Sequence, residues 1–281
     1  MPIDLITARM RAVKNFRPRG FTGFTARGLF FKLLSQYEQG LASIIHDFKG
    51  IAPYSVSPIH IASNGRLEVR FTSFMTRISR ALLDALSSRF DVTVFGERVR
   101  LEEVEVAGVD VPRLMEDAKP VRGYIIEFRT PTCFRRPSPY IPLHTIGIFA
   151  KIMGLIGRPK SRYRFYPLPD PILMLRNLKR QWDQYIGGLF RGRRFTKWVE
   201  EGGVALAGVE GINTHRFVKR GGNSFLVGFT GRARITLPSD TYDPEHAKTV
   251  NILLRMGQYT QTGINRTAGF GVYRIVRERE A

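Results

Sequence analysis

One histidine of this sequence stands where a side chain could transfer protons to a bound substrate. His46 ends a stretch with helical apolar spacing, one position off the apolar stripe and just before a loop. An imidazole, with an unperturbed pKa of about 6.5, can give or take a proton near neutral pH. The residues alone favour a structural role, in which His46 interacts with the carbonyls and the dipole of a helix end. Structural or surface roles are expected for the other histidines, His60, His144, His215 and His246.

A glycine-punctuated polar loop near the C-terminus is a second candidate. Gly263, Gly269 and Gly271 surround Arg266, between a predicted helix that ends near Met256 and a final strand. Glycine allows positive φ angles and lets a ligand approach the main chain closely. Successive exposed N–H groups can then form a concavity for phosphate. A turn whose glycines serve sterics alone is equally consistent with this spacing.

Residues 158–198 are strongly basic and contain only two acidic residues, Asp170 and Asp183. Arginine binds phosphate through two parallel hydrogen bonds, and aromatic rings can stack on unpaired bases. An alternating strand with one buried face would give a similar pattern. The predicted phosphate-binding arginines are Arg162, Arg164, Arg191, Arg193 and Arg194, interleaved with the aromatic residues Tyr163, Phe165, Tyr166 and Phe195.

The composition indicates a protein that binds a polyanion. The 281 residues include 44 basic and 24 acidic side chains, for a net charge of +20. Such a field usually attracts nucleic acid, and less often an acidic membrane surface. A single cysteine, Cys133, allows neither an internal disulfide nor a thiolate metal site. No carboxylate–histidine cluster has ligand spacing, so no metal or cofactor is expected.

Nothing in the sequence predicts secretion or a membrane anchor. The N-terminal residues carry charge through their apolar stretch and lack a small-residue cleavage site. The most apolar run, residues 141–157, is interrupted by Pro142, His144 and Lys151 and is too short for a bilayer. We therefore expect a soluble, cytoplasmic protein. The acidic stretch 97–117 is expected to face solvent.

The elements that would position these residues divide into two halves. Apolar spacing predicts strands at 3–15, 54–62, 66–74 and 92–106, and helices at 26–46 and 76–88. This βαββαβ order is the ferredoxin-like arrangement, an α+β fold with helices on one face of an antiparallel sheet. Gly40 is expected to kink or divide the first helix.

The second half reads as a more elaborate α+β unit of similar type. It contains a strand near 123–128, a proline-rich irregular stretch at 131–142 and a basic helix at 173–185. Further predicted elements are strands at 204–209, 216–219, 225–237 and 271–276 and a helix at 244–256. We expect an N-terminal domain of residues 1–119 and a C-terminal domain of residues 120–281.

Four segments, taken in order, resemble the endoribonucleases that process CRISPR repeat transcripts, within the repeat-associated RNA-binding (RAMP) superfamily. They span most of the chain: LASIIHDFKGIAPYSVSPI, IIEFRTPTCF, GFTGRARITL and the glycine-rich segment LLRMGQYTQTGINRTAGFGVYRI. The resemblance implies tandem ferredoxin-like domains, no cofactor and CRISPR repeat RNA as partner. It also implies metal-independent cleavage within the repeat that leaves a 2′,3′-cyclic phosphate and a 5′-hydroxyl. An interference complex and a homodimer are further partners that it allows.

The resemblance also changes the interpretation of individual residues. It favours His46 as a catalytic proton carrier, because the family's histidine occupies a matching place. Lys49 is expected to contact the scissile phosphate, although a solvated lysine fits equally well. Tyr37 is a weaker catalytic candidate, since nine residues on one straight helix correspond to about 900° and place it opposite His46. Only a break at Gly40 would bring them together, so Tyr37 is better explained by core packing.

Two alternatives stay open on the sequence. The same scaffold could serve a non-catalytic RNA-binding subunit of the superfamily, which His46 in its expected place argues against. A general basic RNA-binding protein, such as a ribosome-associated factor, would have a similar charge but no single cut site. Neither the repeat sequence nor the base preference follows from the residues.

Overall fold

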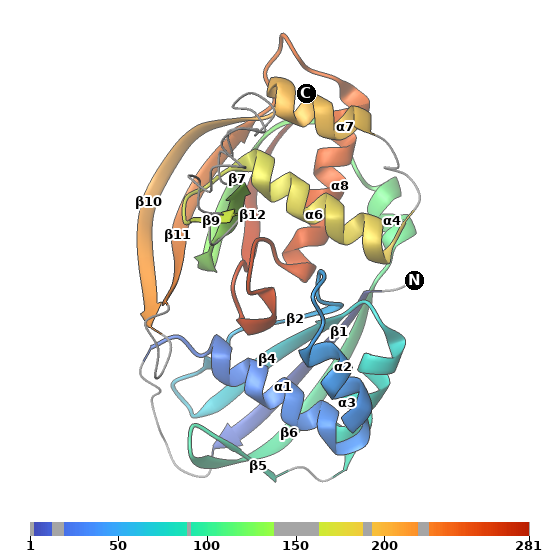
Figure 1. The fold of residues 1–281 in the computed structure, drawn as a ribbon, viewed down its shortest axis with the longest axis vertical. Helices are drawn as coiled ribbons and strands as arrows, with labels where there is room; N and C mark the ends of the chain where they lie inside the picture. The colour runs from blue at the N-terminus through green and yellow to red at the C-terminus, as the bar shows by residue number, and fades with distance from the viewer. Residues whose placement is uncertain are drawn as a thin grey trace, which may run out of the picture.

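The computed structural model describes residues 3–12, 20–88, 91–137, 163–187, 193–218 and 225–280. Its strands form two larger antiparallel sheets and a small two-stranded ribbon. Each larger sheet carries helices on one face, and the two units meet end to end (Figure 1). The fold is therefore α+β, as the sequence predicts.

The first sheet has the strand order β2-β4-β1-β6-β5, with β3 also paired to β4. Helices α1 and α3 cover one face of this sheet, where Phe30, Leu33, Phe71 and Leu82 are fully buried. In chain order the elements are β1 (Ile3–Ala12), α1 (Gly23–Tyr37), α2 (Gln39–His46), β2 (Tyr54–Val56), β3 (His60–Ile61), β4 (Arg66–Ser73), α3 (Thr76–Ser87), β5 (Asp91–Val94), β6 (Glu97–Val109) and α4 (Val111–Glu116).

The second sheet has the order β10-β11-β7-β12, and α6 and α8 pack on one of its faces. Among the described strands, β8 and β9 pair only with each other, as a ribbon that lies between β7 and α6 in chain order. The elements are β7 (Val121–Thr132), β8 (Phe134–Pro137), β9 (Tyr163–Tyr166), α6 (Pro171–Tyr185), α7 (Arg193–Trp198), the π-helical turn η1 (Val199–Gly203), β10 (Ala205–Val218), β11 (Phe225–Thr236), α8 (Pro244–Thr260), the 3₁₀ turn η2 (Arg266–Ala268) and β12 (Tyr273–Glu280).

Both sheets have the ferredoxin-like strand order, in which the first strand lies between the third and the fourth of each βαββαβ unit. The expected tandem arrangement is thus confirmed. We infer a domain boundary between residues 119 and 120, because β6 of the first sheet ends at Val109 and β7 of the second begins at Val121. Helix α4, between them, packs against α8.

The first predicted helix divides at Glu38 rather than at Gly40. Glu38 leaves the helical region, with φ −140° and ψ 62°, and its carboxylate binds Arg77 of α3 at 2.8 Å. The break turns α2 so that Leu41 and Ile45 reach the core. The helix therefore ends two residues before Gly40, at a residue paired with α3, and the turn allows α2 to bury Leu41 and Ile45.

Three other predictions about the elements are wrong. The single strand predicted at 92–106 is a hairpin of β5 and β6, because Phe95 and Gly96 form a turn with positive φ angles. The proline-rich stretch is not wholly irregular, since β8 occupies residues 134–137 and residues 138–142 lie outside the described part. The two strands predicted between 204 and 219 are one continuous strand, β10.

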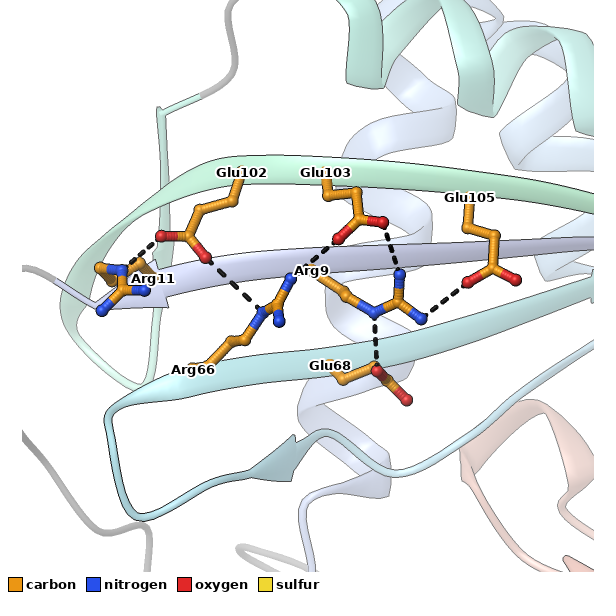
Figure 2. A network of polar contacts seen from close by, with 7 residues as sticks. All are labelled: Arg9, Arg11, Arg66, Glu68, Glu102, Glu103 and Glu105. Carbon is orange, nitrogen blue, oxygen red and sulfur yellow. Dashed lines mark hydrogen bonds and ion pairs between the residues drawn. The ribbon is translucent and has the colours of Figure 1, made fainter.

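The open face of the first sheet carries an ion-pair network across β4, β1 and β6 (Figure 2). The guanidinium group of Arg9 lies 2.9 Å from Glu68, 2.8 Å from Glu103 and 2.7 Å from Glu105. Opposite charges on adjacent strands stabilise pairing and register. The acidic stretch predicted to face solvent is thus partly exposed, but several of its carboxylates are matched within the sheet.

Candidate nucleic-acid interface and catalytic loop

A cleft of about 480 Å³ lies where the two domains meet. The first domain contributes residues 48–52, the loop that follows α2 and His46. The second domain contributes residues of β8 and β9, residues between 173 and 180 of α6, and residues 263–267 of the glycine-rich loop. In Figure 1 the blue loop after α2 rises toward the red turn that contains η2.

Five cationic side chains line the cleft, and no described carboxylate does: Lys49, Arg135, Arg176, Arg180 and Arg266. Arg176 forms an ion pair at 3.2 Å with Glu200, which is not one of the residues that line the cleft. Two half-exposed aromatic rings, those of Phe48 and Tyr163, stand among the cations. A concave surface of one charge sign concentrates field and attracts phosphate groups. The cleft therefore combines cations for a nucleic-acid backbone with rings that can stack on bases.

His46 is solvent-accessible at the edge of this region. Its side chain is 65% exposed and lies two residues before Phe48, the first lining residue of its loop. Its Nδ1 is 3.2 Å from a carboxylate oxygen of Asp47, and its ring meets the ring of Phe31 at 5.5 Å. A proton on Nδ1 would be held by Asp47 and would leave Nε2 free toward solvent. The geometry is thus open to substrate and suits proton transfer.

Tyr37 is not brought to His46. Helix α2 folds back so that His46 reaches Phe31 in the middle of α1, whereas Tyr37 ends α1 at the opposite end of α2. Eight helical residues span about 12 Å, which separates the two side chains. Tyr37 is also 48% exposed, so the core packing expected for it is wrong as well. The break at Glu38 explains both results.

The amides of the three glycines are not free to cradle phosphate. Gly263 donates to Oδ1 of Asn177 at 2.9 Å, Gly269 to the carbonyl of Arg266 at 3.3 Å and Gly271 to the carbonyl of Pro131 at 3.1 Å. All three have φ between +78° and +80°. Any Cβ there would meet backbone, closest at 1.8 Å for Gly271. These bonds and close contacts agree with the steric explanation of the loop, and of the three glycines only Gly263 lines the cleft.

Arg266 lines the cleft but is 5% exposed, which differs from the open phosphate contact expected of it. Its Nη1 donates to the carbonyl of Thr260 at 2.8 Å and its Nη2 to the carbonyl of Ala52 at 3.0 Å. Burial lowers the pKa of Arg266 to about 10, which still leaves it charged at neutral pH. This guanidinium joins the glycine-rich loop to the loop after His46.

The structure places the other predicted arginines only in part. Arg164 on β9 and Arg194 on α7 are exposed, and the backbone of Arg193 begins α7. Arg162 and Arg191 lie outside the described residues. The site residues that the sequence prediction missed are Arg135, Arg176, Asn177 and Arg180. Arg176 and Arg180 were detectable as an i, i+4 pair on one face of the basic helix.

A model of the family described as CRISPR-associated endoribonuclease Cas6 matches residues 126–273, just over half of the chain. The chain belongs to the Cas6 family. No curated protein matches the sequence of the chain. The Cas6 assignment agrees with the predicted endoribonuclease class and with the resemblance noted in the sequence.

Solved Cas6 structures share the whole fold. Thermus thermophilus Cas6 (TTHB231) is 23% identical with a TM-score of 0.70, over 98% of this chain and 99% of that one. A product complex of Cas6 (TTHA0078) is 20% identical with a TM-score of 0.71, over 99% and 100%. A Cas6-related protein from Pyrococcus furiosus is 12% identical with a TM-score of 0.60, over 99% and 100%. At these identities the likeness establishes the fold and leaves residue roles to the geometry.

No described helix combines the length and the apolar character needed to cross a membrane. Within the same residues, no three or more histidine, cysteine or acidic side chains gather as a metal-binding group. Cys133 is buried, and burial raises the pKa of its thiol to about 11, which keeps it protonated and unreactive.

Proposed function

We propose that the chain is a metal-independent endoribonuclease that binds the repeat of a CRISPR precursor transcript in the interdomain cleft and cuts it to generate guide RNAs. The observation that carries this proposal is a cleft lined by five cations and no described carboxylate. One wall of this cleft is the loop that follows His46 at the end of α2. The family match supports the endoribonuclease class. Similar structures include a Cas6 product complex and a RAMP protein binding RNA substrates.

The proposed nucleophile is the RNA's own 2′-hydroxyl. Its oxygen attacks the neighbouring phosphorus, the bond from phosphorus to the 5′-oxygen breaks, and a 2′,3′-cyclic phosphate and a 5′-hydroxyl result. The 2′-hydroxyl loses a proton as its oxygen attacks, and the departing 5′-oxygen gains one. His46 makes one of these two transfers and solvent water makes the other, while Asp47 orients the imidazole ring. Lys49, exposed at the cleft wall, steadies the charge on the phosphate.

The second domain holds the RNA backbone in this mechanism. Arg176 and Arg180 point into the cleft from one face of α6, and Arg135 enters from β8. The phosphate contacts position the strand without reading its sequence. Tyr163 and Phe48 offer ring faces for unpaired bases. Exposed Arg164 and Arg194 extend the basic surface of the same domain. An interference complex that receives the product, and a homodimer, are further proposed partners.

Cleavage of the repeat RNA in EDTA tests the proposal. The wild type should produce one cut, and His46→Ala should slow it by about 10²-fold or more while the RNA still binds. A 2′-deoxy substitution at the cut site should abolish cleavage, because the nucleophile is gone. Cleavage of the deoxy substrate would refute the attack by the 2′-hydroxyl. RNA binding without cleavage by the wild type would instead indicate a non-catalytic RNA-binding subunit.

A further inference from the structure

The loop that carries Lys49 is held from the other domain. Two consecutive carbonyls of this loop, those of Ile51 and Ala52, accept hydrogen bonds from Tyr185 at the end of α6 and from Arg266 in the glycine-rich loop. Lys49 itself is exposed and has no ion pair with a described residue. The position of Lys49 therefore depends on donors that belong to the second domain.

Each donor is itself fixed by contacts that favour this single arrangement. The ring of Tyr185 stacks on Phe74 of the first domain, with ring centroids 4.7 Å apart and an interplanar angle of 16°. Burial raises the pKa of Tyr185 to about 12, so its hydroxyl keeps the proton that it donates. Arg266 is tied at its other nitrogen to Thr260, the last residue of α8. Each side chain is therefore held by a second contact besides its hydrogen bond to the loop.

We infer that Tyr185 and Arg266 are positioning residues of the cleavage reaction, which hold the loop of Lys49 against RNA bound by the second domain. The inference rests on the proposed function. Tyr185 is five residues beyond Arg180 on the same helix, so α6 both presents a cation to the cleft and fixes the opposite wall. A displacement of about 1 Å can cost about 10²-fold in rate when reacting groups must be aligned.

This arrangement makes the two domains a single catalytic unit. The second domain supplies most of the cations of the cleft, whereas His46 and Lys49 come from the first. Without the two cross-domain hydrogen bonds, the loop would keep few interactions of its own, because Phe48, Lys49 and Gly50 are exposed. Loop segments with few buried contacts open locally at low free-energy cost. Loss of the donors should therefore affect the cleavage step more than the binding of RNA.

Tyr185→Phe removes one hydroxyl and keeps the ring that stacks on Phe74. The matched control is Tyr242→Phe, because the buried hydroxyl of Tyr242 has no hydrogen-bond partner among the described residues and its ring is retained against Arg122. The single-turnover cleavage rate at saturating protein and the Kd for an uncleavable 2′-deoxy repeat RNA are measured separately. Tyr185→Phe should lower the rate by about tenfold with less than a twofold change in Kd, and Tyr242→Phe should change neither.

Two further measurements separate positioning from a general loss of structure. Arg266→Lys keeps the charge and one donor and should retain more of the rate than Arg266→Gln. In a Lys49→Ala background, Tyr185→Phe should have a smaller effect than in the wild type, because its target side chain is absent. The inference would be overturned if the loss of cleavage rate in Tyr185→Phe were fully accounted for by a lower melting temperature. It would also be overturned if the effects of Tyr185→Phe and Lys49→Ala on the cleavage rate were fully additive.

Hydrogen exchange of residues 47–53 gives a readout that does not need activity. In the protein without RNA, Tyr185→Phe should speed amide exchange in this segment by several-fold relative to the wild type and to Tyr242→Phe. If the wild type did not cleave RNA, the proposed function would fail, while exchange would still show whether Tyr185 holds the loop. Unchanged exchange in Tyr185→Phe would overturn the positioning role on its own.

Discussion

Gly263→Ala distinguishes two explanations of the glycine-rich loop. Gly263 has φ +80°, and an added Cβ would lie 2.5 Å from the carbonyl oxygen of Cys133. That oxygen also accepts from the amide of Ile264 at 2.8 Å, and the Gly263 amide donates to Asn177 at 2.9 Å. The contact is with backbone, so no flexible side chain can move aside. Alanine must therefore shift the loop.

The expected loss of stability follows from these contacts. A left-handed conformation costs a residue with a Cβ about 1–2 kcal/mol. Displacing the loop weakens two hydrogen bonds, each worth about 1 kcal/mol net. We expect the free energy of unfolding to fall by about 3 kcal/mol, a large part of the roughly 5–15 kcal/mol typical of a folded protein.

Gly28→Ala is the control for this prediction. Gly28 lies in α1, and an added Cβ there would meet nothing within 4 Å. Alanine in a helix is more favourable than glycine by up to about 1 kcal/mol, so this variant should be as stable as the wild type or more so. Urea unfolding of both variants measures the difference, and RNA affinity is measured alongside. Normal stability of Gly263→Ala with lost RNA affinity would refute the packing explanation and restore the phosphate cradle.

Three further predictions concern charge. Replacing Arg176 and Arg180 together by Gln should weaken RNA binding and lower the slope of log K against log salt by about 1.4, whereas Arg80→Gln, on the exposed face of α3, should leave both nearly unchanged. Cleavage by His46→Ala should stay slow at every pH from 6 to 9, because the proton carrier is gone; cleavage at the wild-type rate at any of these pH values would contradict its role. Burial raises the pKa of Glu127, but hydrogen bonds from its arginine neighbours outweigh this and lower it. The stabilising contribution of Glu127 should be present above the unfolded pKa of about 4.3 and lost as the pH falls through the lower pKa of the folded state. The difference in free energy of unfolding between the wild type and Glu127→Gln should therefore become smaller at acidic pH.

Regular local patterns made most of the fold predictable from sequence. Asp170 and Asp243, each followed by proline, mark the starts of α6 and α8, where their carboxylates accept from the amides of Leu173 and His246. Apolar periodicity located the helical regions of the first domain at 26–46 and 76–88 and most strands, whereas the short helices α4 and α7 were not predicted. The breaks were harder to predict, because the bend at Glu38 depends on Arg77, which is distant in sequence and belongs to another helix.

The candidate site was predictable where a residue's neighbours along the chain decide its exposure. His46 and Lys49 are exposed at a helix end and in the following loop, as their positions indicate. Arg266 was misjudged for the opposite reason. A positive residue in a polar, glycine-rich loop is usually solvated, but contacts with Ala52 and Thr260 bury this one between the domains. Its hydrogen-bond partner Ala52 is 214 residues away in the sequence and Thr260 is 6 residues away, so the burial of Arg266 depends on the tertiary structure.

The burial of Arg266 explains why a glycine-rich loop and a basic cleft occur together. A charged guanidinium deep at the interface is costly unless its N–H groups are satisfied, and carbonyls from both domains meet that need. Those carbonyls come within reach only if the loop packs tightly against the first domain. At Gly269 an added Cβ would lie 2.9 Å from the Cα of Gly23, so only glycine permits this approach. In the proposed mechanism the glycines therefore act on RNA indirectly: they allow the contact that lets Arg266 hold Ala52, and through Ala52 the loop of Lys49.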